Sequence, residues 1–170
     1  MTSDVTAFDH YDATSDSGDW EDMTLAPGEM ANALEAPANV PVAPGHGFAV
    51  DVAELPLERD PDTGFGSCGW RTLICGDRTP SSGMVMGVAE FGPGETLEPH
   101  RHGPAEVYFG LTGTGVVTIE GVAHEIRPGV AVYLPPEAEH GTVAGSTGLT
   151  FAYCFPTGRF ADVDYRFSPR

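Results

Sequence analysis

The chain has 170 residues, of which 25 are acidic and 8 are basic, so its formal net charge is -17. All basic residues are arginine, and the absence of lysine excludes a Schiff-base lysine, a pyridoxal phosphate anchor and a phosphate-binding GK[ST] loop. Such a polyanion is also a poor partner for nucleic acid or an anionic membrane, because binding either depends on neutralising phosphate charge.

The three cysteines, Cys68, Cys75 and Cys154, show neither CxxC spacing nor a histidine partner at zinc-finger distance. They therefore indicate a reduced setting rather than a disulfide framework. The N-terminal residues lack the basic and apolar regions of a secretory signal, and the chain has no run of about 18 apolar residues. We expect a cytoplasmic protein that does not span a membrane.

Acidic residues are concentrated in the first part of the chain. Residues 1–62 contain 14 of the 25 acidic residues and only Arg59 as a base. Residues 1–47 are rich in Asp, Ser, Ala, Pro and Gly, a composition that buries too little apolar surface to offset the entropy lost on ordering. We expect this N-terminal segment to be extended or disordered, as a solvated tail or as a lid, and residues 48–69 to be a connector.

Short apolar or alternating runs follow from residue 70, separated by Gly and Pro about every 8–12 residues. This pattern predicts an all-β barrel over residues 70–156, followed by a C-terminal tail, residues 157–170, that packs along its outside. Residues 113–115 and 120–121 are expected to form tight hairpin turns. The predicted strands are residues 70–75, 84–91, 106–112, 116–120, 123–126, 130–135, 142–144 and 149–155.

Two histidines separated by one residue form a candidate metal-binding pair. His100 and His102 leave the same face of an extended segment, so both imidazoles can approach one point. Glu106 follows four residues later, and His140 follows another predicted strand. Three imidazoles and a carboxylate suit a divalent ion of Fe, Mn, Ni, Co or Zn, and they leave coordination positions open for water or substrate.

The spacing around these residues resembles the two motifs of the cupin superfamily. The first runs Gly94, five residues, His100-Arg101-His102, three residues, Glu106, six residues and Gly113. The second runs Gly129, five residues, Pro135 and then His140. The resemblance implies a single cupin barrel, which is a double-stranded β-helix or jelly roll, with His100, His102, Glu106 and His140 as metal ligands.

Two positions depart from the second motif. Glu137 stands where a glycine is usual, and Ala144 stands where an asparagine is usual. Neither residue is a ligand in the family, so the departures concern the geometry of a turn and a contact beyond the ligands rather than the metal. Because small cupins are often dimers, the resemblance also implies a homodimer.

Tyr108 lies two residues after Glu106 and shares its face of the predicted strand, so it points into the barrel beside the metal. A nearby cation lowers the pKa of a phenol, which can then act as a general base; the alternative is that Tyr108 only packs. Phe151, Tyr153 and Phe155 share a second strand face and are expected to fill the core, with Tyr153 as a candidate substrate-binding residue.

The order His-x-His, three residues, Glu, one residue, Tyr, with the last His 34 residues after the Glu, is similar to that of cupin-type dimethylsulfoniopropionate lyases. The resemblance implies a metal-dependent enzyme that acts on a small carboxylate or polar molecule. By this resemblance, a bound metal would hold the substrate carboxylate and acidify the α-proton, Tyr108 would remove that proton, and dimethyl sulfide would depart to leave acrylate. The alternatives are an Fe(II)-dependent dioxygenase with the same ligands and a non-catalytic cupin that binds a small molecule.

Overall fold

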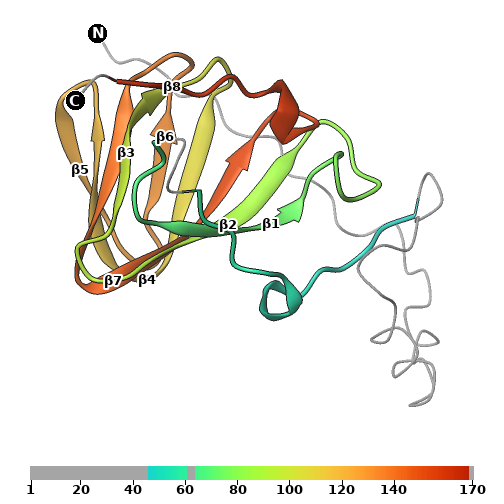
Figure 1. Cartoon of the computed structure of the whole chain (residues 1–170), viewed down its shortest axis with the longest axis horizontal. Coiled ribbons are helices and arrows are strands. Elements are labelled where there is room, and N and C mark those ends of the chain that lie inside the picture. Colours follow the sequence, from blue (N-terminus) through green and yellow to red (C-terminus); the bar gives the residue numbers. More distant parts are fainter. Residues whose placement is uncertain (1–45, 61–63, 169–170) are drawn as a thin grey trace, which may run out of the picture. The chain divides into compact units, whose positions relative to one another are not determined.

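The computed structural model of the chain describes residues 46–60 and 64–168 (Figure 1). The expected N-terminal segment, residues 1–47, lies outside the described residues except for its last two positions. No helix in the described part of the chain has the length and apolar character needed to cross a membrane. The elements are η2 (Val52–Glu54), β1 (Gly69–Ile74), β2 (Val85–Phe91), β3 (Thr96–Arg101), β4 (Glu106–Ile119), β5 (Val122–Ile126), β6 (Ala131–Leu134), β7 (His140–Phe155), η3 (Phe160–Asp162) and β8 (Arg166–Phe167).

Two long strands connect the other strands of the sheet. β4 has 14 residues and β7 has 16, and they pair with each other along most of their length. The first half of β7 also pairs with β3 and its second half with β2, whereas β4 pairs with β6 and then with β5. β1 and β8 lie at the two ends of the order β1-β2-β7-β3-β8 (Figure 1). These antiparallel pairings confirm the predicted jelly-roll barrel.

The turn predicted at residues 113–115 is wrong. β4 continues through these residues, and its pairing with β7 shifts register between Gly113 and Gly115. Gly113 has a φ of 67°, and an added Cβ there would collide with the carbonyl oxygen of Gly148. The strands predicted on either side of residues 144–148 are likewise one strand, β7. Glycine occurs both at bulges, where a strand pair bends, and in tight turns. The local sequence therefore does not distinguish a bulge from a turn.

The hairpin turn predicted at Glu120 and Gly121 is confirmed. Both residues have positive φ, 46° and 79°, and they join the end of β4 to the start of β5. A two-residue loop with positive φ at both positions matches the right-handed twist of the strands that it connects.

Alternation along β4 determines which of its side chains enter the barrel. Glu106 and Tyr108 are buried, whereas Val107 and Phe109 are exposed. Successive side chains of a strand point to opposite faces, so Glu106 and Tyr108 share the inner face as the sequence predicts.

The aromatic row predicted on β7 fills the barrel core. Phe151, Tyr153 and Phe155 are all buried, and Tyr108 stacks on Phe151 with ring centroids 4.2 Å apart. Gly87 of β2 is the register partner of Tyr153, and a Cβ at position 87 would collide with the Tyr153 hydroxyl. Because Gly87 has no side chain, the Tyr153 ring can lie directly over its backbone.

Gly87→Ala should lower the free energy of unfolding by about 1–3 kcal/mol, because the added methyl group collides with the Tyr153 ring and with the backbone carbonyl oxygen of Arg71. Urea unfolding followed by circular dichroism measures this change. Gly47→Ala is the matched control, since nothing lies within 4 Å of a Cβ at that position, and we expect it to change stability by less than about 0.5 kcal/mol. Equal stability of the two variants would show that Tyr153 does not need the space above Gly87.

Candidate metal centre

Four side chains of metal-ligand type meet on the inner face of the barrel. His100 lies in β3, Glu106 begins β4, His140 begins β7, and His102 lies in the connection between β3 and β4. Each is at most 3% exposed. His100 and His140 are register partners in the β3–β7 ladder, and their ring centroids are 4.2 Å apart. The fold therefore brings together the residues that the sequence spacing singles out.

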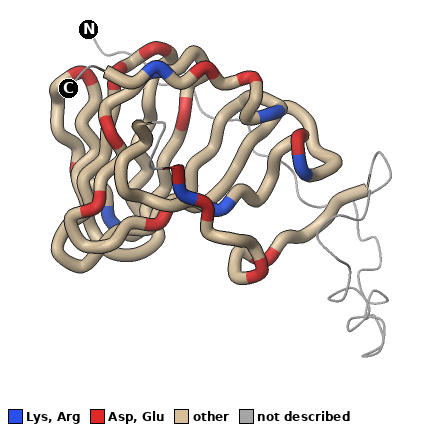
Figure 2. Tube along the Cα trace, viewed as in Figure 1, with Lys and Arg blue, Asp and Glu red and all other residues tan. Residues whose placement is uncertain are grey.

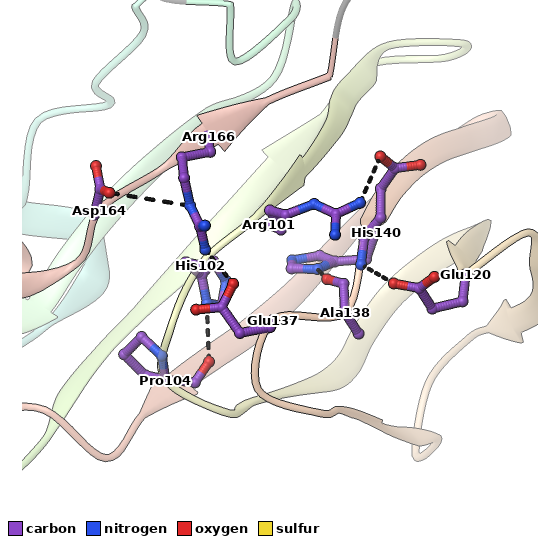
Figure 3. A network of polar contacts seen from close by, with 10 residues as sticks. Arg101, His102, Pro104, Glu120, Glu137, Ala138, His140, Asp164 and Arg166 are labelled. Atoms are coloured by element: carbon purple, nitrogen blue, oxygen red, sulfur yellow. Dashed lines mark hydrogen bonds and ion pairs between the residues drawn. The ribbon is translucent and has the colours of Figure 1, made fainter.

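Backbone carbonyl groups orient all three imidazoles in the same way. Each Nδ1 lies 2.8–2.9 Å from a carbonyl oxygen two residues away in the chain. The pairs are His100 with Glu98, His102 with Pro104 and His140 with Ala138, the last two of which are drawn in Figure 3. Because a carbonyl oxygen only accepts hydrogen bonds, Nδ1 carries the proton and the Nε2 lone pair is left for another group.

These lone pairs converge beside a carboxylate. One ring nitrogen from each of His100, His102 and His140 lies within 4.8 Å of the other two. Glu106 Oε2 is 3.2 Å from His102 Nε2 and 3.5 Å from His140 Nε2. A lone pair and a carboxylate oxygen repel each other at such distances unless a proton or a metal ion lies between them. The arrangement therefore fits a divalent metal ion, and this donor set accepts any of the transition ions named above.

The electrostatics of the cluster favour the protonation states that a metal ion requires. Burial, together with the nearby His140, lowers the pKa of His100 to about 4, so this imidazole is neutral at neutral pH. Burial alone would raise the pKa of Glu106, but His102 and His140 beside it hold that pKa below its ordinary value. Metal binding needs a neutral imidazole and an ionised carboxylate, so His100 and Glu106 need not lose a proton at neutral pH before an ion binds.

The cluster opens on a cavity of about 210 Å³. His100 and Glu106 form part of its wall, and most of the other large side chains in the wall are aromatic. A space of this size holds a small molecule and excludes a polymer. The arrangement thus places a cation site at the edge of an apolar cavity, which is the general construction of a small-molecule site.

Tyr108 and Tyr153 both line this cavity. Tyr108 is 2% exposed, and its ring centroid lies 6.2 Å from that of His140. Burial, and then the charge of Glu106, raises the pKa of Tyr108 well above its ordinary value, and burial also raises the pKa of Tyr153. The protein itself therefore favours protonated phenols, and the lower pKa of Tyr108 expected beside a cation stays a prediction.

Three further residues reach the cavity without any signal in the sequence. Tyr165 belongs to the segment expected to pack along the outside of the barrel, yet it lines the cavity with its ring centroid 5.4 Å from that of His100. Glu58 and Arg78 form a bidentate ion pair in the cavity wall, with N–O distances of 2.6 and 2.8 Å. The other arginines of the described ranges pair with acidic side chains away from this lining. Figure 2 shows the basic and acidic positions along the chain trace.

Comparisons with solved structures agree with the barrel architecture. The polyketide cyclase RemF from Streptomyces resistomycificus superposes with a TM-score of 0.62 at 22% identity, covering 74% of this chain and 87% of RemF. A chain from the crystal structures of the dimethylsulfoniopropionate lyases RdDddP and RnDddQII gives a TM-score of 0.59 at 18% identity, covering 68% of this chain and 63% of that one. At such identities the likeness establishes the fold and nothing more.

Comparisons of sequence establish the family. The Cupin domain family matches residues 87–154. The dimethylsulfoniopropionate lyase DddW of Ruegeria pomeroyi is 51% identical over 138 residues, which cover 81% of this chain and 89% of DddW. The chain belongs to the cupin superfamily and, within it, resembles the dimethylsulfoniopropionate lyases.

Proposed function

We propose that this protein is a metal-dependent lyase that eliminates dimethyl sulfide from dimethylsulfoniopropionate and leaves acrylate. The observation that carries the proposal is the buried cluster of three imidazoles and one carboxylate at the edge of a small, largely aromatic cavity. Such a cluster offers a cation to a substrate carboxylate. The 51% identity to DddW favours this chemistry over the others that occur on the same fold.

His100, His102, Glu106 and His140 are the proposed metal ligands. A divalent ion bound there would hold the substrate carboxylate and make the neighbouring α-hydrogen more acidic. The protein contributes the alignment of the ligands. Because the three Nδ1–carbonyl hydrogen bonds fix the imidazole rings, the ligands lose little conformational freedom when an ion binds.

Tyr108 is the proposed general base, since it shares the inner face of β4 with Glu106 and lines the same cavity. With a divalent ion bound beside it to lower its pKa, the Tyr108 phenolate would take the α-proton, and the electron pair of the C–H bond would become the second bond of the C=C group. The bond between the β-carbon and sulfur breaks with its electrons on sulfur, so neutral dimethyl sulfide leaves and acrylate keeps the carboxylate charge. No oxidant is consumed in these steps.

Tyr153 is the proposed substrate-binding residue. It is the register partner of Tyr108 in the β4–β7 ladder, and its ring lines the cavity. The hydroxyl adds a polar group to a largely aromatic wall, where it is available to a polar end of the substrate.

The homodimer and the cytoplasmic location stay predictions. For the homodimer, the outward face of β4 offers support, because Val107, Phe109 and Leu111 are 40–45% exposed and Tyr133 of the adjacent strand β6 is 60% exposed. A second copy of the chain that covered this face would remove a contiguous apolar surface from water.

His140→Ala should abolish dimethyl sulfide release and most of the bound metal, because it removes one of four ligands from the centre of the cluster. Elemental analysis of the purified variant measures the metal, and circular dichroism checks that the barrel is folded. His124→Ala, at an exposed histidine of β5, is the control and should keep both metal and activity. Full metal occupancy in His140→Ala would reject the ligand set.

Tyr108→Phe should keep the metal but lower the turnover of dimethylsulfoniopropionate by roughly 100-fold or more, because the phenyl ring preserves the stacking on Phe151 and removes the base. Gas chromatography of dimethyl sulfide gives the rate. Tyr133→Phe, at a side chain that is 60% exposed, should leave turnover unchanged. A rate near that of the wild type in Tyr108→Phe would mean that Tyr108 only packs.

The metal-loaded protein should form acrylate at the same rate with and without oxygen, because the elimination transfers no electrons to an oxidant. Acrylate is measured by liquid chromatography after loading with each candidate ion in an anaerobic chamber. Loss of turnover on removing oxygen would favour the Fe(II)-dependent dioxygenase. Ligand binding without turnover under every ion would favour the non-catalytic cupin.

A further inference from the structure

Glu137 adopts a backbone conformation that is unfavourable for its type. Its φ is 64°, in the left-handed region, within the turn that leads from β6 to His140. Its backbone N–H donates to the carbonyl oxygen of His102 at 2.9 Å, so the turn is attached to the connection that carries this ligand. Glycine would occupy the conformation without strain, and glycine is the residue that the cupin motif has here. Because this conformation is strained for glutamate, we expect an interaction of the Glu137 side chain that offsets the strain.

The side chain of Glu137 reaches a segment near the C-terminus. Its carboxylate forms an ion pair with the guanidinium group of Arg166 in β8, which also lies near Asp164 (Figure 3). We call residues 164–168 the C-terminal strap. Glu137 therefore connects the turn before one metal ligand to a segment 29 residues further along the chain.

The strap lies against the imidazoles. Tyr165 and Phe167, on either side of Arg166, both contact the His100 ring, with centroid distances of 5.4 and 5.6 Å. Tyr165 is also 5.3 Å from the His102 ring, and it lines the cavity. The position of the strap therefore determines where the cavity wall lies beside the metal cluster.

The sheet alone holds the strap weakly. β8 has only two residues, which pair with His100 and Arg101 of β3. Beyond this ladder, the Ser168 N–H donates to the Pro99 carbonyl oxygen at 2.9 Å, and the Ser168 hydroxyl donates to Glu139. An ion pair with a second segment thus adds a constraint that a two-residue strand does not provide.

We propose that Glu137 is a positioning residue, whose ion pair with Arg166 holds the C-terminal strap over His100 so that Tyr165 forms the wall of the cavity beside the metal cluster. The effect on catalysis rests on the proposed lyase function, whereas the placement of the strap does not. The carboxylate explains why this chain keeps a non-glycine residue in a left-handed turn.

Glu137→Gly separates the two roles, because it relieves the backbone and removes the carboxylate. If Glu137 served the turn only, glycine would raise the melting temperature and leave kinetics unchanged. We expect the melting temperature to stay equal or rise and the metal content to stay the same. Amide hydrogen exchange of residues 165–168 should become about two- to fivefold faster, with the core strands unchanged, because the ion pair is about half exposed at both ends. The value of kcat/KM should fall about two- to fivefold, mainly through KM.

Arg166→Gln tests the same ion pair from the other side without altering the turn. It should reproduce the changes in exchange and KM, and the double variant Glu137→Gly/Arg166→Gln should be no worse than either single variant, because the two residues act through one interaction. Asp162→Asn is the matched control, since it removes an exposed ion pair with Arg159 that precedes the strap; it should change neither quantity.

Wild-type exchange rates in both single variants would overturn the inference, and so would faster exchange with an unchanged KM in an active protein. If the wild-type protein shows no lyase activity while both variants still accelerate exchange of the strap, the proposed function fails but the anchoring of the strap by Glu137 stands. The two failures are therefore distinguishable.

Discussion

The site depends on the repulsion between electron pairs that the fold forces together. A carbonyl oxygen accepts a hydrogen bond from the Nδ1–H group of every imidazole in the cluster, so each Nε2 presents a lone pair toward the others. Glu106 adds a carboxylate oxygen at 3.2 Å from one of these nitrogens. Such a group of acceptors is stable inside a protein only when protons or a metal ion compensate it, so the rest of the barrel can be understood as a frame that keeps the acceptors in place.

The frame can hold the candidate ligands in place because they lie at or near strand ends. Glu106 is the first residue of β4, His140 is the first residue of β7, and His100 lies one residue before the end of β3. The β4–β7 pair runs through the whole barrel, and bends where Gly113 and Gly148 permit close backbone approach. Long-range strand pairing thus sets the relative positions of ligands that are up to 40 residues apart in the chain, counted from His100 to His140.

The sequence predicts the convergence of the four candidate ligand side chains better than it predicts the strands. His100, His102 and Glu106 are close in the chain, so a local spacing reports their convergence. The glycines at 113–115 and 144–148 fit both a turn and a bulge, and only the pairing of β4 with β7 decides between them. Tyr165 carries no pattern at all, because its place beside His100 results from the return of the chain end to β3.

Two parts of the chain form the cavity wall beside the cluster: the long strands β4 and β7, and the C-terminal strap. Tyr108 and Tyr153 belong to the sheet that also fixes the ligands, so changing their positions would disturb the metal cluster. Tyr165 lies on a short strap that no ligand belongs to. A substitution of Tyr165 would reshape the space beside the cluster and would also remove the ring contacts that Tyr165 makes with His100 and His102. The chain end therefore sets the position of the cavity wall beside His100, whereas β4 and β7 set the position of the wall at Tyr108 and Tyr153.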